Sequence, residues 1–118
     1  MRKNLTKNQI LNKKTDIDRI FKQGCINSCK GMRLVTISNN LFFDRFIIIP
    51  AKKYGNSVQR NKVRRQMKEL FRLYSNRVQN SETTLGKDIA LVIYPGKVLD
   101  YTQLNSNFYN LLDNVYLK

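Results

Sequence analysis

The chain has 118 residues, 42% of them hydrophobic, so it is long enough and apolar enough to fold as one domain around a core. Its 22 lysines and arginines stand against 8 acidic residues, and the resulting net charge of +14 predicts a polyanionic partner, with nucleic acid as the first candidate. The 2 cysteines and the lack of histidine exclude a zinc site built from four cysteine and histidine ligands of this chain.

Residues 1–14 are polar and basic, and we expect them to form a flexible arm in front of a single domain that spans residues 1–118. This start lacks the apolar segment of a signal peptide, and no apolar run reaches the roughly 18 residues that span a bilayer. We therefore expect a cytoplasmic protein without a membrane partner. Residues 1–77 hold 19 basic and 4 acidic side chains, whereas residues 78–118 hold 3 and 4, so the partner should meet the first two thirds of the chain.

A short helix is predicted from Thr15 to Gly24, because glycine favours a helix end. Asp18 stands three residues after Thr15, which is the spacing of a capping box. Cys25 and Cys29 follow, and we interpret both as reduced thiols, with a disulfide or a bridging metal site as the alternatives. The side chains expected to pack on one side of the helix are Ile17, Ile20 and Phe21.

Residues 32–38 are rich in β-branched and apolar side chains and predict a strand, followed by a turn at Asn39 and Asn40. The return strand of this hairpin is expected within residues 41–51, where a continuous apolar run suits burial on both faces before Pro50 ends it. This part of the sequence therefore predicts two neighbouring antiparallel strands.

The stretch 55–74 combines an apolar stripe with a high density of cations. In a helix, its apolar side chains fall within roughly a third of the circumference, as expected for a side that faces a core. Gly55, Asn56 and Ser57 supply a turn and a helix N-cap, and the exposed amides of the first turn add partial positive charge. The apolar side chains of this stripe are Val63, Met67, Leu70, Phe71, Tyr74 and, just beyond the stretch, Val78.

The opposite side of this helix is predicted to be basic. Steps of four, three and four residues stack Asn61, Arg65, Lys68 and Arg72 along it, with Arg64 on the flank. Glu69 is the only acid in the stretch, so the row cannot neutralise itself and favours binding to phosphates. A solvated charged face is the alternative, and the net charge of the chain argues against it.

Residues 88–94 predict a second buried strand, which Pro95 and Gly96 end. Two buried strands joined by a long helix form a βαβ unit with parallel strands, whose common connection is right-handed. A final helix is expected at residues 101–116, where apolar side chains repeat at helical spacing. The predicted order is αββαβα, with one additional short strand allowed, in an α/β fold.

The chain offers no self-contained catalytic or metal site. It lacks a histidine as general base, a Walker-type phosphate loop and a G-x-S-x-G nucleophile turn. Its carboxylates are scattered, and only Asp16 and Asp18 lie close together, at a helix start where acids favour the dipole. We therefore predict no catalytic and no metal-binding residues in the protein itself.

The sequence from residue 52 to residue 65, KKYGNSVQRNKVRR, resembles the signature of the bacterial ribonuclease P protein subunit, KKxGNAVxRNRxKR. The basic arm, the short first helix and the later strand agree with that family in order. The resemblance implies an α+β sandwich with a central mixed sheet, a left-handed βαβ crossover and a ribosomal-protein-like fold. It also implies a subunit of the endonuclease that removes the 5′ leader of precursor tRNA, in which a catalytic RNA supplies the active site and holds Mg²⁺, without an obligate protein partner.

The resemblance implies two groups of contact residues as well. Family members often have aromatic residues at the positions of Ile17 and Val35, so apolar contact replaces base stacking there. Lys62 replaces an arginine of the signature, which keeps the charge and loses bidentate phosphate geometry. The implied contacts to the catalytic RNA are Arg60, Asn61, Lys62, Arg64, Arg65, Lys68 and Arg72. The implied lining of a cleft for the single-stranded leader is Ile17, Phe21, Arg33, Val35, Lys52 and Lys53.

Three other functions fit parts of the sequence less well. A stand-alone nuclease would use Asp16, Asp18 or Glu69 with Mg²⁺, and cleavage by the RNA-free protein would reveal it. A ribosomal or other structural RNA-binding protein would share the basic surface without the near-complete signature. A DNA-binding helix-turn-helix would place the basic helix after a short partner helix, whereas here it lies between predicted strands.

Overall fold

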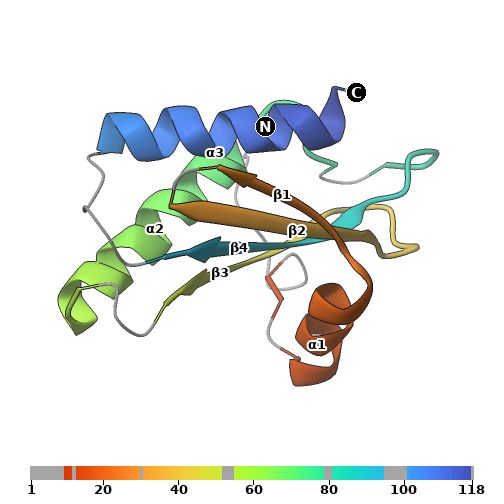
Figure 1. The fold of residues 1–118 in the computed structure, drawn as a ribbon. Coiled ribbons are helices and arrows are strands. Elements are labelled where there is room, and N and C mark those ends of the chain that lie inside the picture. Colours follow the sequence, from red (N-terminus) through yellow and green to blue (C-terminus); the bar gives the residue numbers. More distant parts are fainter. Residues whose placement is uncertain are drawn as a thin grey trace.

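The computed structural model describes residues 10–11, 13–29, 31–51, 55–78, 81–94 and 101–117. These residues form three helices and a four-stranded sheet (Figure 1). The predicted order of elements is confirmed, and the additional short strand is the first of the four. In chain order the elements are α1 (Lys14–Gln23), β1 (Cys25–Cys29), β2 (Met32–Ser38), β3 (Arg45–Pro50), α2 (Ser57–Leu73), β4 (Lys87–Ile93) and α3 (Tyr101–Tyr116).

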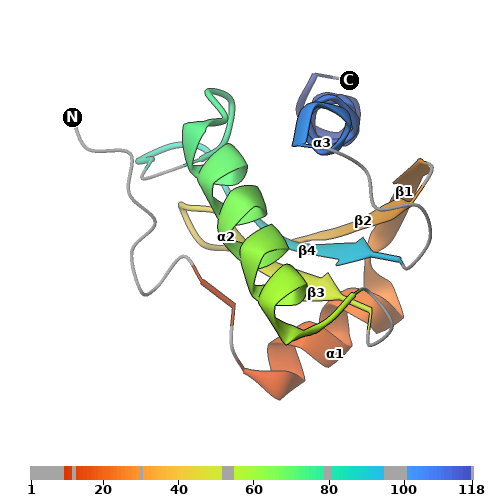
Figure 2. The same ribbon diagram turned by 90° about the vertical axis from the view of Figure 1, so that its left-hand side faces the viewer.

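The sheet has the strand order β1-β2-β4-β3, with β3 and β4 parallel and the other neighbours antiparallel. The predicted hairpin between β2 and β3 is wrong, because β4 lies between these strands and pairs with both. Instead β2 forms a hairpin with β1, through a turn in which Gly31 takes a φ of 82°, a left-handed conformation that glycine adopts without strain. The parallel βαβ unit is confirmed, and Figures 1 and 2 show a left-handed connection through α2.

Helices α2 and α3 cover one face of the sheet, and α1 lies against the other (Figure 2). The larger core lies under α2 and α3, where Phe46 of β3 stacks on Phe71 of α2 with ring centroids 4.4 Å apart. The smaller core lies under α1 and contains Leu11, Ile20, Val35 and Ala90. The two cores together bury most of β4 on both faces, which explains its continuous apolar run. β3 is an edge strand and is fully buried only on the face toward α2 and α3, so the predicted burial of this run on both faces is not complete.

Helix α2 forms where its local sequence predicts it. Asn56 is the N-cap, and its side chain accepts a hydrogen bond from the Gln59 amide at 2.9 Å. The Asn56 amide donates in return to Gln59 Oε1 at 2.9 Å, which completes a capping box. Gly55 has a φ of 57°, which favours glycine. The buried residues of the helix are Val63, Met67, Leu70 and Phe71, as the periodicity predicts.

Helix α1 begins one residue earlier than predicted and lacks the predicted capping box, since its N-cap residue makes no side-chain capping hydrogen bond. Asp16 in its first turn is instead paired with Arg45 of β3 at 3.4 Å, so contacts across the fold decide where this helix lies. Part of the segment predicted as a flexible arm belongs to the fold, because Leu11 is buried and its amide donates to the Phe46 carbonyl at 2.9 Å. Residues 1–9 lie outside the described residues.

Two tyrosines link α3 to other parts of the fold through carboxylates. The hydroxyl of Tyr74, which follows α2, donates to Asp113 of α3 at 2.7 Å. Tyr116 of α3 donates to Asp44, whose oxygens also accept two backbone amides at 2.7 Å. Burial, with the neighbouring carboxylate, raises the pKa of both tyrosines, that of Tyr74 to about 12.

At alkaline pH, a variant with phenylalanine in place of Tyr74 should lose less of its free energy of unfolding than the wild type does. The unfolded chain releases the Tyr74 proton at about pH 10, whereas the folded chain holds it to about pH 12, so the free energy of unfolding falls as pH rises through this window. Urea unfolding between about pH 8 and pH 11 should therefore give a shallower decline for Tyr74→Phe than for the wild type. The control Tyr94→Phe, at an exposed tyrosine, shows how much of the change comes from the loss of any tyrosine hydroxyl. Equal slopes for Tyr74→Phe and the wild type would contradict this linkage.

Candidate nucleic-acid interface

The exposed side of α2 forms a basic surface. Because the apolar stripe of the helix is held in the larger core, the remaining side chains are left to solvent. In the described part of the chain, no carboxylate lies within ion-pair distance of its lysines, Arg64 or Arg65. Their charge is therefore available to an anionic partner. We call this surface the basic face, and its residues are Arg60, Asn61, Lys62, Arg64, Arg65, Lys68 and Arg72.

Two arginines of the basic face are held by hydrogen bonds to nearby groups. Arg60 Nη1 donates to the Gly55 carbonyl at 3.0 Å, and its Nη2 donates to Ser57 Oγ at 3.2 Å. Arg64 Nη1 donates to Asn61 Oδ1 at 2.9 Å. Arg60 thus lies beside the first turn of α2, where backbone amides add partial positive charge. This arrangement suits phosphate oxygens, to which guanidinium groups can donate two parallel hydrogen bonds.

Arg72 differs from the other cations of the basic face, because it is paired within the helix. Its Nε donates to Glu69 Oε2 at 2.9 Å, and its Nη2 contacts the other carboxylate oxygen. The hydrogen bonds from Arg72 lower the pKa of Glu69. Residues 60–68 therefore present the predicted row of cations on one side of α2. Arg72, the last residue of that row, is neutralised by Glu69.

A second candidate surface lies on the face of the sheet that carries α1, at the end which that helix leaves uncovered (Figure 1). We call it the open sheet face and define it by Arg33, Ile49, Val92 and Tyr94. Val92 of β4 is the register partner of both Arg33 of β2 and Ile49 of β3. The Arg33 guanidinium lies 5.5 Å from the ring centroid of Tyr94, which is 39% exposed. The open sheet face therefore combines a cation, an exposed aromatic ring and apolar side chains.

The structure brings some of the residues predicted for leader binding to this side of the sheet. Phe21 of α1 is 45% exposed, Ile17 is half-buried, and Arg33 belongs to the open sheet face. Val35 is only 1% exposed and lies in the smaller core under α1, so the prediction that it lines a cleft is wrong. Strand alternation indicates the face on which Val35 lies but not the helix that covers it. The predicted residues outside the described part of the chain are Lys52 and Lys53.

Tyr94 is a candidate contact that the sequence interpretation missed. It follows β4 directly, two positions after Val92, and the contact with Arg33 places it on the same face. The sequence indicates this contact through an aromatic residue that continues the alternation of side chains between the two sheet faces, just past the end of a buried strand.

The described residues do not assemble a metal site. They contain no group of three or more histidine, cysteine, aspartate or glutamate side chains that could hold a metal ion. Asp16 and Glu69, considered above for a stand-alone nuclease, are each paired with an arginine. Cys25 and Cys29 are free thiols, and burial raises the pKa of Cys29.

Among the helices that the structure describes, none is long and apolar enough to cross a membrane.

Comparison with known sequences finds one family. A family model described as Ribonuclease P matches residues 5–116. The ribonuclease P protein component of Alkaliphilus metalliredigens is 30% identical over 111 residues, which cover 93% of this chain and 96% of that protein. The ribonuclease P protein component of Borreliella burgdorferi strain B31 is 34% identical over 103 residues, which cover 85% and 83%.

Comparison with solved structures finds the same fold. The chain matches the RNase P protein of Staphylococcus aureus with a TM-score of 0.77 and 27% identity, over 91% of this chain and 94% of that one. It matches the RNase P protein of Thermotoga maritima with a TM-score of 0.72 and 24% identity, over 88% and 94%. The mixed four-stranded sheet with three helices is thus shared with these two structures.

Proposed function

This chain belongs to the ribonuclease P protein family, and we propose that its basic face binds the catalytic RNA while its open sheet face holds the single-stranded 5′ leader of precursor tRNA. The chain is a protein subunit of the endonuclease ribonuclease P, and the catalytic RNA of that enzyme performs the cleavage of precursor tRNA. A structural RNA-binding protein without a processing role is not favoured by these relatives. One observation carries the proposal: opposite the buried apolar stripe of α2, Lys62, Arg64, Arg65 and Lys68 have no carboxylate partner among the described residues.

The basic face is suited to the backbone of a folded RNA. Phosphate contacts give affinity and orientation without reading sequence, which is what a subunit needs if it must recognise one RNA by shape. Arg60, Arg64 and Arg65 would make the directional contacts, because each guanidinium can engage two phosphate oxygens. Asn61 and the lysines add hydrogen bonds and charge along the same helix. Arg72 joins them when a phosphate competes with Glu69 for its guanidinium.

The open sheet face offers the leader a surface that tolerates many sequences. Tyr94 can stack on any base, a contact worth ~1 to 3 kcal/mol, while Arg33 can hold an adjacent phosphate. Phe21 and Ile17 of α1 extend the apolar part of this surface, and Lys52 and Lys53 remain part of the proposal. Contacts of this kind would bring precursor tRNA to the catalytic RNA without restricting the leader sequence.

We assign Mg²⁺ to the RNA partner. When bound there, Mg²⁺ can activate water and stabilise charge on the reacting phosphate. The described part of this chain gives it no comparable site, because its buried carboxylates, Asp44 and Asp88, are occupied by hydrogen bonds from the protein. The protein contributes by binding and orienting RNA, and its cations lower the repulsion between the phosphates of the two RNAs.

Reconstitution tests this proposal directly. The full-length protein is added to its catalytic RNA at low Mg²⁺, and cleavage of precursor tRNA at the mature 5′ end is measured. We expect the protein to increase cleavage at that site. Binding to the RNA without any effect on cleavage would favour a structural role, and cleavage by the protein without RNA would favour a stand-alone nuclease.

Binding to the catalytic RNA should depend strongly on salt. If the basic face neutralises ~4 phosphates at a flexible RNA segment, the logarithm of the affinity should fall with the logarithm of salt concentration at a slope of about −3. Filter binding at several potassium concentrations gives this slope. A slope near zero would contradict the electrostatic basis of the proposal.

Replacing Arg33 by alanine should weaken binding of precursor tRNA and leave mature tRNA unaffected. Loss of one phosphate contact and of the cation beside Tyr94 should cost about 1 kcal/mol, or about fivefold in affinity. The measurement compares precursor and mature tRNA on the holoenzyme, so mature tRNA is the internal control. An equal loss for both RNAs would assign Arg33 to another contact.

A further inference from the structure

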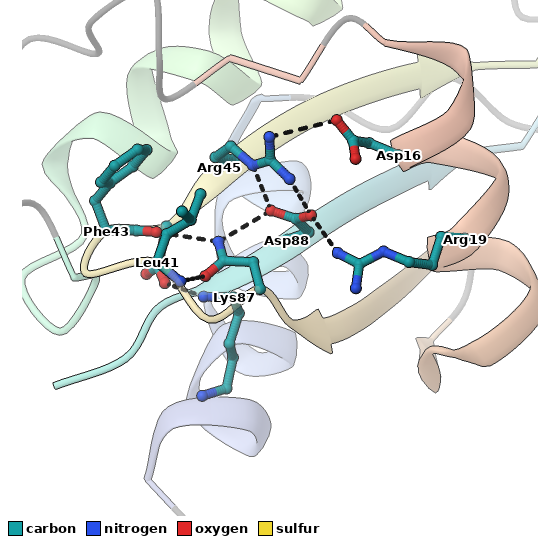
Figure 3. A network of polar contacts seen from close by, with 9 residues as sticks. Asp16, Arg19, Leu41, Phe43, Arg45, Lys87 and Asp88 are labelled. Carbon is teal, nitrogen blue, oxygen red and sulfur yellow. Dashed lines mark hydrogen bonds and ion pairs between the residues drawn. The ribbon is translucent and has the colours of Figure 1, made fainter.

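A buried polar network joins α1 to the sheet at the end opposite the open sheet face (Figure 3). At its centre is Asp88 of β4, whose carboxylate is completely buried. Arg45 of β3 donates to both carboxylate oxygens, from Nε at 2.7 Å and from Nη2 at 2.6 Å. Asn39 donates at 3.0 Å and Arg19 of α1 at 3.1 Å. Arg45 also reaches Asp16 of α1 at 3.4 Å, so α1 is bound to the network twice.

The two attached residues of α1 lie nearly one turn apart on the same side of the helix. Ile17 and Phe21, proposed above to contact the leader, lie beyond the buried Ile20, roughly 150° around the helix from Asp16 and Arg19. Apolar packing through Ile20 is non-directional and would tolerate some rotation of α1 about its axis. Hydrogen bonds are directional, so two of them to a rigid, buried centre restrict that rotation.

We propose that Asp16 and Arg19 are positioning residues, which set the rotation of α1 and thereby the direction in which Ile17 and Phe21 meet the leader. This inference rests on the proposed leader site. The buried Arg45–Asp88 pair is the common anchor, and the rest of the network connects it to the helix. The leader would thus be recognised by a surface whose two sides, sheet and helix, are held at a fixed angle by charge pairs.

The two positioning residues can be tested without dismantling the network. Their side chains are partly exposed, 26% for Asp16 and 37% for Arg19, and replacing either one leaves the Arg45–Asp88 contacts in place. The variants are Asp16→Asn and Arg19→Gln, which change the net charge from +14 to +15 and to +13. Because the charge changes are opposite, a simple electrostatic effect would move RNA affinity in opposite directions.

Two exposed residues of the same helix provide matched controls. Asp18→Asn repeats the charge change of Asp16→Asn, and Lys22→Gln repeats that of Arg19→Gln. Neither Asp18 nor Lys22 forms an ion pair in the described part of the chain. The measured quantity for all four variants is the ratio of holoenzyme affinities for precursor and mature tRNA, together with affinity for the catalytic RNA.

We expect Asp16→Asn and Arg19→Gln each to lower the precursor-to-mature ratio by about fivefold, since apolar contacts to the leader are partly lost. Affinity for the catalytic RNA should stay within about twofold, because the basic face is on another element. The inference is overturned if the ratio is unchanged, if the two variants shift it in opposite directions, or if the controls shift it equally. A wild-type holoenzyme that does not distinguish precursor from mature tRNA would instead overturn the leader site itself.

Discussion

Replacing Arg64, Arg65 and Lys68 together by alanine should lower affinity for the catalytic RNA by about a hundredfold. Each lost cation removes about 1 kcal/mol, the upper range for an exposed ion pair, and the three together remove about 3 kcal/mol. The salt slope should also become shallower by about 2, since three phosphate contacts are lost. All three side chains are exposed, and alanine favours helix, so the fold should be kept. Filter binding at several salt concentrations, with circular dichroism, measures both effects.

A matched triple variant separates the position of the charges from their number. Lys13, Lys14 and Lys22 are exposed at α1, and replacing them by alanine also changes the net charge from +14 to +11. This control should bind the catalytic RNA much more tightly than the α2 variant. Equal weakening of both would mean that only the total charge matters, and the basic face would lose its assignment.

Replacing Asp88 by alanine should lower the free energy of unfolding more than any of the other substitutions proposed for this protein. Its carboxylate is completely buried and accepts hydrogen bonds from two arginines and an asparagine. Removing it leaves the Arg45 guanidinium, which is 19% exposed, with the longer contact to Asp16 as its one remaining ion pair among the residues that the structure describes. Breaking a buried pair from one side costs about 3 to 5 kcal/mol, a large part of the stability of a small domain. Urea unfolding followed by circular dichroism gives this difference in the free energy of unfolding.

The exposed Asp18 provides the control for this prediction. Asp18→Ala removes the same chemical group from a position without an ion pair in the described part of the chain, and its effect should stay within about 0.5 kcal/mol. A loss below about 1 kcal/mol for Asp88→Ala would show that water or a neighbouring side chain compensates Arg45. The network would then hold α1 more weakly than its geometry suggests.

Local features of the sequence were sufficient to predict α2 and its exposed cations. The periodicity of its apolar side chains, the glycine before Asn56 and the Asn56–Gln59 cap all lie within the helix or next to it. Such short-range signals do not depend on the rest of the fold. The same is true of β4 and α3, whose apolar patterns were long enough to indicate their type and approximate limits.

Features that depend on distant partners could not be predicted in this way. Pairing of β2 with β4 rather than β3 depends on a segment that follows about fifty residues later, and no local pattern encodes it. Val35 lies on the same face of its strand as Arg33, which side-chain alternation indicates, but its burial depends on α1. The position of Asp88 in an apolar strand does predict a charged partner, because an acid that is buried in such a strand is rarely left unpaired. The sequence interpretation did not use this feature.

The central place of β4 has a consequence for the growing chain on the ribosome. When β3 has been synthesised, β2 and β3 still lack the strand that separates them, and their facing edges carry unpaired amide and carbonyl groups. The sheet can close only after residue 93 has emerged, by which time most of the chain has been translated. Until then these edges are open to wrong pairing, so chaperones or early contact with RNA would protect a nascent chain of this topology.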